Sequence, residues 1–241
     1  MLDLNSNISV IFPTYNEQDN IIEAINRTTR TLNKKLLEII IVDDDSSDNT
    51  RKYINELCKS RKDITLIHRT QIRGLSSAIA DGVSASRGKV VCWLDCDLGI
   101  PPEEIDNLLI YINDYDVVIG SRFEKNGLDT RKKWITISSR LINYLAYIFL
   151  SNKVKDYTSG FICINRRILE KIKINNIGFG EYFIELMHDC IKNGFTIKEV
   201  GYVYNDRKSG ESKSTGSFII FLILGFSYIK KIFKLKFKKY E

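Results

Sequence analysis

Two aspartates that follow an apolar run are the residues best suited to chemistry. Asp95 and Asp97 come directly after residues 90–94 (VVCWL), a run typical of a buried strand. In an extended segment, residues two apart point the same way, so both carboxylates can face one site. Two such groups repel unless protons or a cation neutralise them, and their hard oxygens suit Mg²⁺ or Mn²⁺ shared with a diphosphate. The alternative is that Asp97 caps the next helix and Asp95 merely ends a strand.

Other polar residues follow other apolar runs. Asp43 comes after residues 37–42 and can accept hydrogen bonds from a base or ribose, whereas Asp44 and Asp45 are more typical of a turn. Arg122 follows residues 117–120, and its guanidinium suits a phosphate; the alternative is a surface ion pair. In the polar stretch 206–216, an arginine and a lysine on either side of Ser209-Gly210 can close over a diphosphate or simply be solvated; they are Arg207 and Lys213.

The elements that must position these residues alternate along the first half of the chain. Strand-type runs lie at 8–12, 37–42, 64–68, 90–94 and 117–120, and helix-type stretches at 20–32, 48–58, 75–85 and 101–112. This alternation predicts an α/β fold with a mostly parallel sheet and helices on both faces. Ligands of such sheets bind beyond the carboxyl ends of the strands, which is where the polar residues above fall. Further on, we expect helices at 135–150 and 182–192 and strands at 160–165 and 196–203.

The last segment has a different composition. Residues 218–229 are apolar except for Ser227, and residues 230–241 hold six lysines and one glutamate. A run of twelve is shorter than the roughly 20 residues that span a bilayer, so we expect an amphipathic helix lying on an anionic leaflet. The alternative is a helix packed on the body with a solvated tail. We therefore divide the chain into a body, 1–216, and a membrane-interface segment, 217–241.

Composition excludes several classes of protein. Of the net charge of +6 in 241 residues, the last twelve positions supply five charges, so no basic groove for nucleic acid is expected on the body. The chain lacks the G-x-G-x-x-G and G-x-x-x-x-G-K-[ST] patterns of dinucleotide and P-loop sites. Five cysteines without metal-type spacing and only two histidines argue for a reducing compartment and against zinc. The first residues show no export signal, so we expect a cytoplasmic body.

Taken together, these segments resemble a known family. The chain is similar to the family 2 glycosyltransferases of the GT-A fold, and most closely to the dolichol- or polyprenol-phosphate mannose synthases, over residues 8–215. The superfamily is marked by residues 10–17 (VIFPTYNE), 39–46 (IIIVDDDS) and 95–98 (DCDL). Residues 73–78, 120–123 and 159–161 agree with it, and 206–213 (DRKSGESK) points to the polyprenyl-phosphate branch.

The resemblance implies a role for each matching residue. The nucleotide-binding positions would be Pro13, Tyr15, Glu17, Ile41 and Asp43. The metal and diphosphate centre would be Asp95, the backbone of Cys96, and Asp97, with Arg122, Arg207 and Lys213 around the phosphates. Asp97 and Arg122 would be the catalytic residues. Gly99 departs from the family because relatives often carry a side chain there that helps to hold the metal. Asp45 departs because relatives usually have glycine there.

The activity that the resemblance implies is inverting, metal-dependent transfer of a hexose, mannose from GDP-mannose, onto polyprenyl or dolichyl phosphate at the cytoplasmic face of a membrane. The acceptor phosphate would meet some of Arg131, Lys132, Lys133 and Arg140, or these residues form a basic membrane-facing surface. Three alternatives stay open. They are a UDP-glucose-dependent polyprenyl-phosphate glucosyltransferase, a family 2 enzyme acting on a glycan, and a silent nucleotide-sugar-binding module, which the intact charged residues disfavour.

Overall fold

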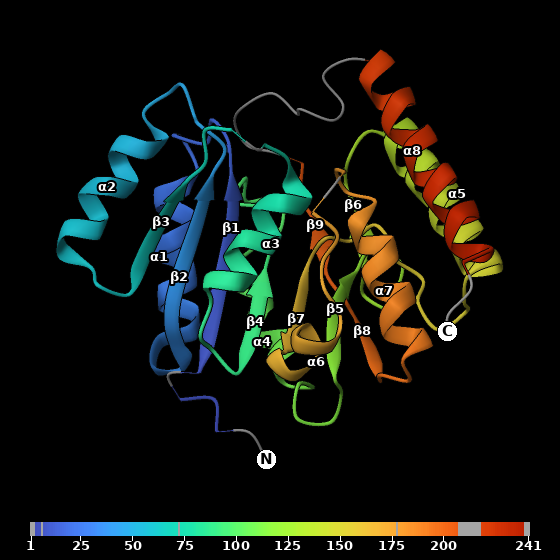
Figure 1. The fold of residues 1–241 in the computed structure, drawn as a ribbon, viewed down its shortest axis with the longest axis horizontal. Helices are drawn as coiled ribbons and strands as arrows, with labels where there is room; N and C mark the ends of the chain where they lie inside the picture. The colour runs from blue at the N-terminus through green and yellow to red at the C-terminus, as the bar shows by residue number, and fades with distance from the viewer. Residues whose placement is uncertain (1–2, 6, 72, 177, 207–217, 239–241) are drawn as a thin grey trace.

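Seven strands rich in valine and isoleucine form the central sheet of the computed structural model, which describes residues 3–5, 7–71, 73–176, 178–206 and 218–238 (Figure 1). Their order across the sheet is β3-β2-β1-β4-β7-β5-β8. The strands are β1 (Ile8–Thr14), β2 (Leu36–Asp43), β3 (Ile64–His68), β4 (Val90–Trp93), β5 (Val117–Ser121), β7 (Ile162–Asn165) and β8 (Ile197–Gly201).

All of these strands run parallel except β7. β1 pairs in parallel with β2 and β4, and β5 with β8, whereas β7 is antiparallel to both β4 and β5. The antiparallel β7 directly joins β4 to β5, so the segments that follow β4 and β5 lie at the same edge as the segment that precedes β7. The expectation of a mostly parallel sheet is therefore confirmed, and β7 brings the 155–160 loop to the ligand edge.

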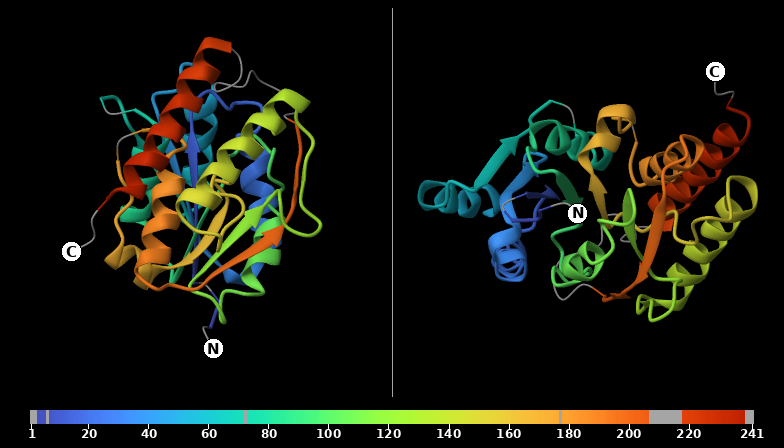
Figure 2. Two further views of the ribbon diagram at one scale, coloured as in Figure 1. Left: turned by 90° about the vertical axis from the view of Figure 1, so that its right-hand side faces the viewer. Right: turned by 90° about the horizontal axis from the view of Figure 1, so that it is seen from below.

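Helices cover both faces of the sheet, and each face has its own buried apolar cluster, because the strands are apolar on both sides. One cluster includes residues of α1 (Ile21–Leu32), α2 (Thr50–Ser60) and α4 (Glu104–Leu109). The other includes residues of α3 (Leu75–Ala85), α6 (Arg166–Lys171) and α7 (Tyr182–Lys192). Seen along the sheet, the two helical layers lie on opposite sides of the strands (Figure 2).

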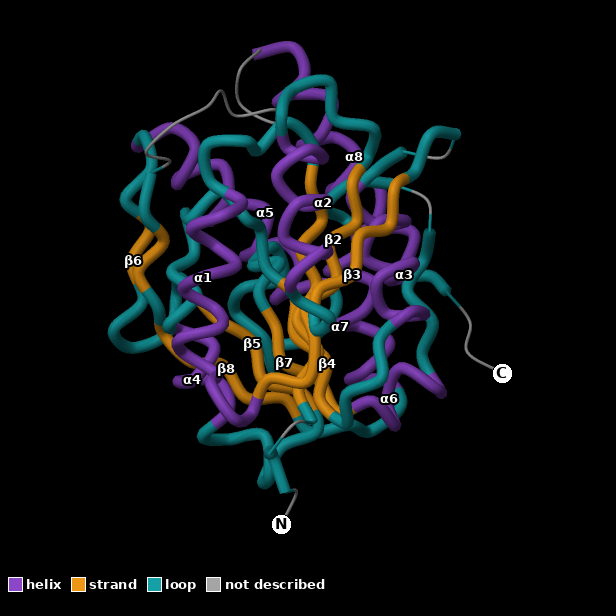
Figure 3. The backbone as a smooth tube through the Cα atoms, turned by 90° about the vertical axis from the view of Figure 1, so that its left-hand side faces the viewer, coloured by secondary structure: helices purple, strands orange, loops and turns teal. Residues whose placement is uncertain are grey.

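Two short strands form a separate sheet beside the main one. β6 (Leu128–Asp129) pairs in parallel with β9 (Val203–Tyr204), and Figure 3 shows β6 set apart from the central strands. This pair holds the loop after β5 against the segment after β8, so that Asp129 and Tyr204 approach the ligand edge together. The sequence did not predict β6 or α6; it predicted one strand over 196–203, which the structure divides into β8 and β9.

The last two long helices lie against each other at one margin of the molecule. α5 (Lys133–Phe149) and α8 (Phe218–Lys236) are side by side in Figures 1 and 2, and α8 also contacts α7. The inner side of α8 is buried at Ile232 and Leu235. No described helix is long and apolar enough to cross a bilayer. The expected C-terminal helix is confirmed, and its packing on the body is the alternative that the sequence left open; contact with a membrane remains a proposal.

An ion pair between α7 and α8 fixes this packing. Lys231 Nζ lies 2.6 Å from Glu185 Oε2, and Asn175 Nδ2 donates to the same oxygen at 3.0 Å. Burial acts to raise the pKa of Glu185, but the hydrogen bonds from Lys231 and Asn175 outweigh it, so that this pKa lies below the ordinary 4.5. Because the folded-state pKa is the lower one, the ionised carboxylate stabilises the fold above pH 4.5 and this contribution is lost as the pH falls through the lowered value.

We therefore expect Glu185→Gln to weaken the docking of α8 by about 1–2 kcal/mol at pH 7, the cost of losing a hydrogen bond to a charged group. Amide hydrogen exchange over residues 225–236 should accelerate relative to exchange in β1. Glu170→Gln, at an exposed position of α6, is the control and should leave that exchange unchanged. Equal exchange in both variants would contradict a stabilising role for this ion pair.

Candidate active site

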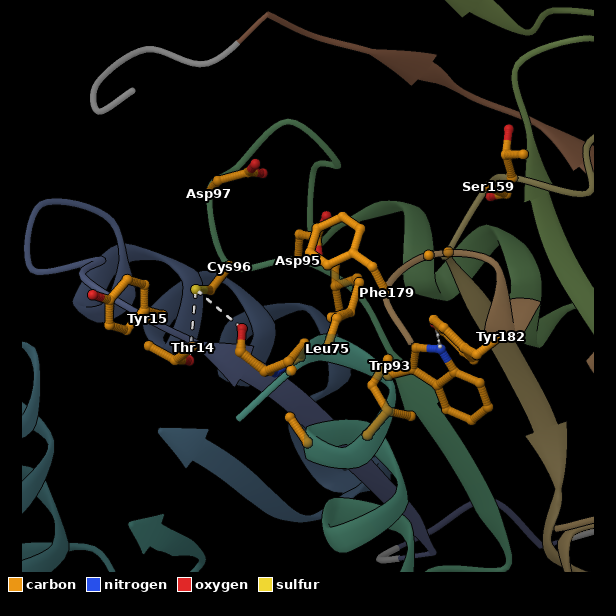
Figure 4. A pocket seen from close by; sticks show the side chains of 18 of the residues that line it. Thr14, Tyr15, Leu75, Trp93, Asp95, Cys96, Asp97, Ser159, Phe179 and Tyr182 are labelled. Carbon is orange, nitrogen blue, oxygen red and sulfur yellow. Dashed lines mark hydrogen bonds between the residues drawn. The ribbon is translucent and has the colours of Figure 1, made fainter. Parts of the chain in front are cut away.

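A pocket of about 520 Å³ lies at the carboxyl ends of the parallel strands (Figure 4). Its walls come from the segments after β1 and β4, from the loop before β7, and from the first turns of α3, α5 and α7. Eight of the residues that the sequence predicted for the site line this pocket: Pro13, Tyr15, Glu17, Asp95, Cys96, Asp97, Arg122 and Arg131. Arg207 and Lys213 lie outside the described residues.

The two aspartates stand on a tight turn directly after β4. Leu98 has φ +62°, and Asp97 Oδ1 accepts the backbone N–H of Gly99 at 2.9 Å. The side chain of Asp97 is 1% exposed, and that of Cys96 packs on the end of β1, with Sγ 3.7 Å from Thr14 Oγ1. Burial raises the pKa of the Cys96 thiol well above its ordinary value. Cys96 thus acts as a small apolar residue that fixes the turn carrying the two carboxylates.

Tyr204 closes this end of the pocket from the side of β9. Burial raises the pKa of its hydroxyl, and the nearby negative charges of Asp97 and Asp95 raise it further, so the phenol stays neutral. A Cβ at Gly99 would lie 3.0 Å from the Tyr204 ring and 3.1 Å from Asp97 Oδ1. The glycine that departs from the family pattern is therefore matched to this tyrosine, which occupies the space of a longer side chain.

The nucleotide-binding positions that the resemblance implies divide into two groups. Pro13, Tyr15 and Glu17 line the pocket, and Glu17 accepts a hydrogen bond from Asn20 at 2.9 Å. Ile41 and Asp43 do not line it, because both are fully buried within β2. Their place on the pocket wall is taken by the next aspartate, which the sequence assigned to the turn.

Asp44 is that residue. It lines the pocket, pairs with Arg69, and accepts the N–H of Gly74 at 2.7 Å, which ties the start of α3 to the end of β2. Asp45, one residue further, has φ +62°, the left-handed conformation that glycine adopts without strain. A hydrogen bond with His68 lowers the pKa of Asp45. Asp45, the second residue that departs from the family pattern, thus keeps the backbone conformation of a glycine. Its carboxylate forms hydrogen bonds with His68 and Arg73.

Arg122 lies in a buried ion pair rather than the surface pair considered as its alternative. Its Nε and Nη2 donate to the two oxygens of Asp156 at 2.9 and 2.7 Å, and Nη2 also donates to Thr158 Oγ1 at 2.8 Å. Burial alone would lower the pKa of Arg122, but the charge of Asp156 and its hydrogen bonds raise it. Glu199 of β8 accepts the N–H groups of Lys155 and Asp156 at 2.7 and 3.0 Å, which fixes the loop that carries the acid.

A second arginine is held nearby in the same manner. Arg131 donates from Nε and Nη2 to Asp129 at 2.9 and 2.6 Å, and its guanidinium carbon lies 4.8 Å from the centre of the Tyr204 ring. Asp129 Oδ2 also lies 3.8 Å from Arg122 Nη1. Burial acts to raise the pKa of Asp129, but the hydrogen bond from Arg131 and the charges of both arginines hold it below its ordinary value. Two guanidiniums and two carboxylates thus form one charge-balanced cluster.

Of the other predicted acceptor-phosphate residues, none lines the pocket. Lys132 and Lys133 are exposed before and at the start of α5, and Arg140 lies on the outer side of that helix with its guanidinium carbon 5.9 Å from the Phe123 ring centre. Arg131 is therefore the predicted acceptor residue that the structure brings to the pocket. The other three belong to the outer surface at this margin.

The family model for glycosyl transferase family 2 matches residues 9–173. The chain belongs to glycosyl transferase family 2. This match spans more than half of the chain and includes the strand ends that carry Asp44, Asp95 and Arg122. As a member of this family the protein is a glycosyltransferase, and the pocket described above is its candidate active site.

Curated relatives of this glycosyltransferase carry closely related names. It is 35% identical over 234 residues to a dolichol-phosphate mannosyltransferase of Pyrococcus furiosus, a match that covers 95% of this chain and 63% of that protein. It is 32% identical to a polyprenol monophosphomannose synthase of Mycolicibacterium smegmatis (86% and 81% covered) and 29% identical to a dolichol-phosphate mannosyltransferase of Saccharomyces cerevisiae (95% and 88% covered). The chain thus spans 63% of the length of the P. furiosus relative.

Solved structures share the fold. Glucosyl-3-phosphoglycerate synthase from Mycobacterium tuberculosis, in complex with Mn²⁺, uridine diphosphate and phosphoglyceric acid, has a TM-score of 0.75 at 16% identity, covering 98% of this chain and 80% of that one. The same enzyme with Mg²⁺ and uridine diphosphate has a TM-score of 0.72 at 17% identity, with 98% and 81% covered. This likeness confirms the predicted GT-A fold of the glycosyltransferase.

The carboxylates of Asp95 and Asp97 suit a divalent cation that binds together with a substrate. They do not form a metal site in which the protein supplies all the ligands. Asp95 and Asp97 both line the pocket, but no cluster of three or more histidine, cysteine, aspartate or glutamate side chains suited to a metal occurs in the described part of the chain. Two carboxylates leave several positions of an octahedral Mg²⁺ or Mn²⁺ to phosphate oxygens and water. This fits a cation shared between the protein and a diphosphate.

Sequence reasoning missed the residues that hold the charged ones in place. Asp156, Thr158 and Glu199 were not singled out, and their signal is faint. Asp156 and Thr158 stand just before residues 159–161, which the resemblance used, and Glu199 follows Lys198 in a strand with charged and apolar residues. Most of the aromatic residues that line the pocket were missed too. They are Trp93, Phe179, Tyr182, Tyr204 and Tyr228.

The buried ion pair gives a stability prediction. We expect Asp156→Asn to lower the free energy of unfolding by about 3–5 kcal/mol, because it leaves the Arg122 guanidinium buried without its counter-charge. Urea denaturation measures the change. Asp106→Asn is the control, because its pair with Lys35 (2.8 Å) is about two-fifths exposed on both sides and should be worth about 0–1 kcal/mol. Similar losses in the two variants would contradict a structural role for the Arg122 pair.

Proposed function

We propose that this glycosyltransferase transfers a hexose, mannose from GDP-mannose, onto polyprenyl or dolichyl phosphate with inversion at the anomeric carbon. The observation that carries the proposal is the composition of the pocket at the carboxyl ends of the strands. It combines Pro13, Tyr15 and the Asp95–Asp97 turn with Arg131 and with side chains from α5 and α8, two helices with exposed apolar residues. The names of the three curated relatives support mannose as the sugar and a dolichol or polyprenol phosphate as the acceptor.

The proposed donor lies with its nucleotide against the end of β1 and its diphosphate at the two aspartates. Asp95 and Asp97 would hold Mg²⁺ or Mn²⁺ together with the diphosphate. Bound there, the ion would screen the phosphate charge and stabilise the nucleoside diphosphate as it leaves. Tyr15 is 36% exposed at the rim and can cover the base, while the buried Glu17 and the partly buried Asp44 shape the wall beneath it.

The proposed acceptor approaches from the side of α5. A phosphate oxygen of the lipid forms a bond to the anomeric carbon while the bond from that carbon to the diphosphate oxygen breaks, and the electron pair leaves with the nucleoside diphosphate. The nucleophile is already anionic, so the chain needs no general base. Arg131 would hold the acceptor phosphate and Arg122 would support it from the buried cluster, so the protein acts by positioning and electrostatic stabilisation. Arg207 and Lys213 are proposed as further phosphate ligands.

The direct test offers labelled GDP-mannose, UDP-glucose or UDP-mannose to the purified protein with Mn²⁺ and polyprenyl phosphate, and counts the label in the organic phase. We expect label from GDP-mannose. Label from UDP-glucose would instead support a polyprenyl-phosphate glucosyltransferase. If no donor labels the lipid but a glycan acceptor becomes labelled, the lipid acceptor proposed here is wrong. If the protein binds donors without any transfer, it is a binding module.

A variant tests the proposed metal role. Asp97→Asn keeps the size of the side chain but removes its charge, so we expect transfer to fall by at least about 100-fold. Electron paramagnetic resonance of Mn²⁺ with GDP should show loss of the protein-bound ion in the same variant. Asp106→Asn, on α4, should leave both readouts unchanged. Full Mn²⁺–GDP binding by Asp97→Asn would contradict the role assigned to this carboxylate.

We further propose that the protein acts at the cytoplasmic face of a membrane, because a polyprenyl phosphate resides in a leaflet. Both helices that supply side chains to the acceptor end of the pocket, α5 and α8, lie at one margin of the molecule (Figure 1).

A further inference from the structure

The outer side of α5 is covered with large apolar side chains. Positions 134, 137, 141, 144 and 148 recur at alternating intervals of three and four, so they form one stripe along the helix. They are all exposed, with Ile137 at 66% and Tyr144 at 61%. The residues of the stripe are Trp134, Ile137, Leu141, Tyr144 and Ile148. Single exposed apolar residues are ordinary on a protein surface, but a continuous stripe of five marks an interaction site.

α8 extends this stripe into a wider face. Phe226 and Phe233 on α8, and Phe237 directly after its last residue, are exposed at a spacing that places them on one side, with Phe226 at 69% and Phe237 at 78%. The ring of Phe233 lies 5.2 Å from the ring of Phe149 on α5, so the two helices present their outer sides together. Figure 2 shows α5 and α8 lying side by side on the surface turned toward the viewer. We call this surface, formed by the stripe of α5 and by Phe226, Phe233 and Phe237, the α5–α8 face.

The charges around the α5–α8 face are all of one sign along its two helices. Neither helix contains an aspartate or glutamate. Exposed basic side chains stand among and beside the apolar ones: Lys133 and Arg140 on α5, and Lys230, Lys234 and Lys236 on α8. The inward lysine of α8, Lys231, is already paired with Glu185 of α7. The face therefore combines apolar side chains with an unbalanced positive charge.

We propose that the α5–α8 face lies on the anionic leaflet of a lipid bilayer. Apolar side chains that enter the leaflet, tryptophan and tyrosine at the boundary, and lysines that reach the headgroups are the features of interfacial helices. A second copy of this chain fits the face less well, because it would bring two positively charged surfaces together. The helices need not cross the bilayer, because they lie along its surface.

This placement differs from the expectation drawn from the sequence. The C-terminal segment was assigned to the membrane, and a basic membrane-facing surface around the start of α5 was only an alternative, but α8 is fixed to the body by Ile232, Leu235 and Lys231. α5, in the middle of the chain, supplies five of the eight large apolar side chains of the face. The body therefore sits on the leaflet with a fixed orientation, which a flexible tail would not impose.

The orientation places the pocket beside the leaflet, and this consequence rests on the proposed function. Ile135 in the first turn of α5 and Tyr228 of α8 line the pocket, as does Arg131 just before α5. A lipid whose tail stays in the bilayer can thus reach Arg131 with its phosphate. The same helices contact the lipid surface with one side and the acceptor end of the pocket with the other.

The test measures binding of the full chain to vesicles without any sugar donor. Vesicles of phosphatidylcholine alone are compared with vesicles that also contain phosphatidylglycerol, and bound protein is separated by sedimentation. We expect binding that requires the anionic lipid. The double variant Ile137→Glu/Leu141→Glu should reduce the partition coefficient by at least about ten-fold, because it places two charges in the apolar stripe while leaving α8 intact. Ile110→Glu is the matched control, because Ile110 is also 66% exposed but lies at the end of α4, on the other face of the sheet.

Two further measurements separate the possible outcomes. Circular dichroism shows whether the Ile137→Glu/Leu141→Glu variant is folded. A second double variant, Lys230→Gln/Lys234→Gln, adds no charge to the stripe and should also bind anionic vesicles less well. Equal binding by wild type, both double variants and Ile110→Glu would overturn the proposal. A wild-type dimer that Ile137→Glu/Leu141→Glu dissociates, without vesicle binding by either protein, would overturn it in favour of a second copy.

Transfer assays keep this inference distinct from the proposed reaction. We expect the Ile137→Glu/Leu141→Glu variant to retain transfer to a short-chain polyprenyl phosphate in detergent and to lose transfer to the same phosphate embedded in vesicles. If the wild type binds vesicles through this face but transfers no sugar to either acceptor, the proposed reaction fails and the docking surface stands.

Discussion

The buried pair between Arg122 and Asp156 is the interaction on which the rest of the site depends. It joins the end of β5 to the loop before β7, and Thr158 extends the connection to α5 through a hydrogen bond from Asn143 at 2.7 Å. A charge pair with so little exposure is stable only when its remaining donors and acceptors are also satisfied. Glu199 meets this requirement by binding the backbone of the loop. Elements that are distant in sequence are thus linked, directly or through one further hydrogen bond, to this ion pair.

The pocket next to this pair holds charges of both signs. Asp95 and Asp97 concentrate negative charge after β4, where Tyr204 keeps a neutral phenol beside them. Arg131, whose charge Asp129 balances, packs on the ring of the same tyrosine. Such an arrangement favours a ligand that brings a cation to the carboxylates and an anion to the arginine. The proposed nucleotide sugar with a divalent ion and the lipid phosphate together have this distribution of charge.

Much of this organisation was predictable from local sequence. Runs of β-branched residues marked the strands, and the parallel topology follows from their alternation with helices, so Asp95 and Asp97 were placed correctly after β4. Residues whose role depends on distant partners were not predictable. Arg122 was expected to be open to a phosphate, but its partner Asp156 comes 34 residues later and meets it only because β7 runs antiparallel between β4 and β5.

The sequence by itself determined the α/β alternation, the family and the turn that carries Asp95 and Asp97. Each of these depends on residues that are close together along the chain. Only the tertiary structure decided which strand-end residues face the pocket. Asp44 does and Asp43 does not, because Asp43 is buried at the end of β2 whereas Asp44, just after it, is held at the pocket wall by Arg69 and the N–H of Gly74. The tertiary structure also decided how α5 and α8 combine. A periodic apolar stripe shows that a helix has a second face, but only packing shows that two such stripes, nearly a hundred residues apart, share one surface.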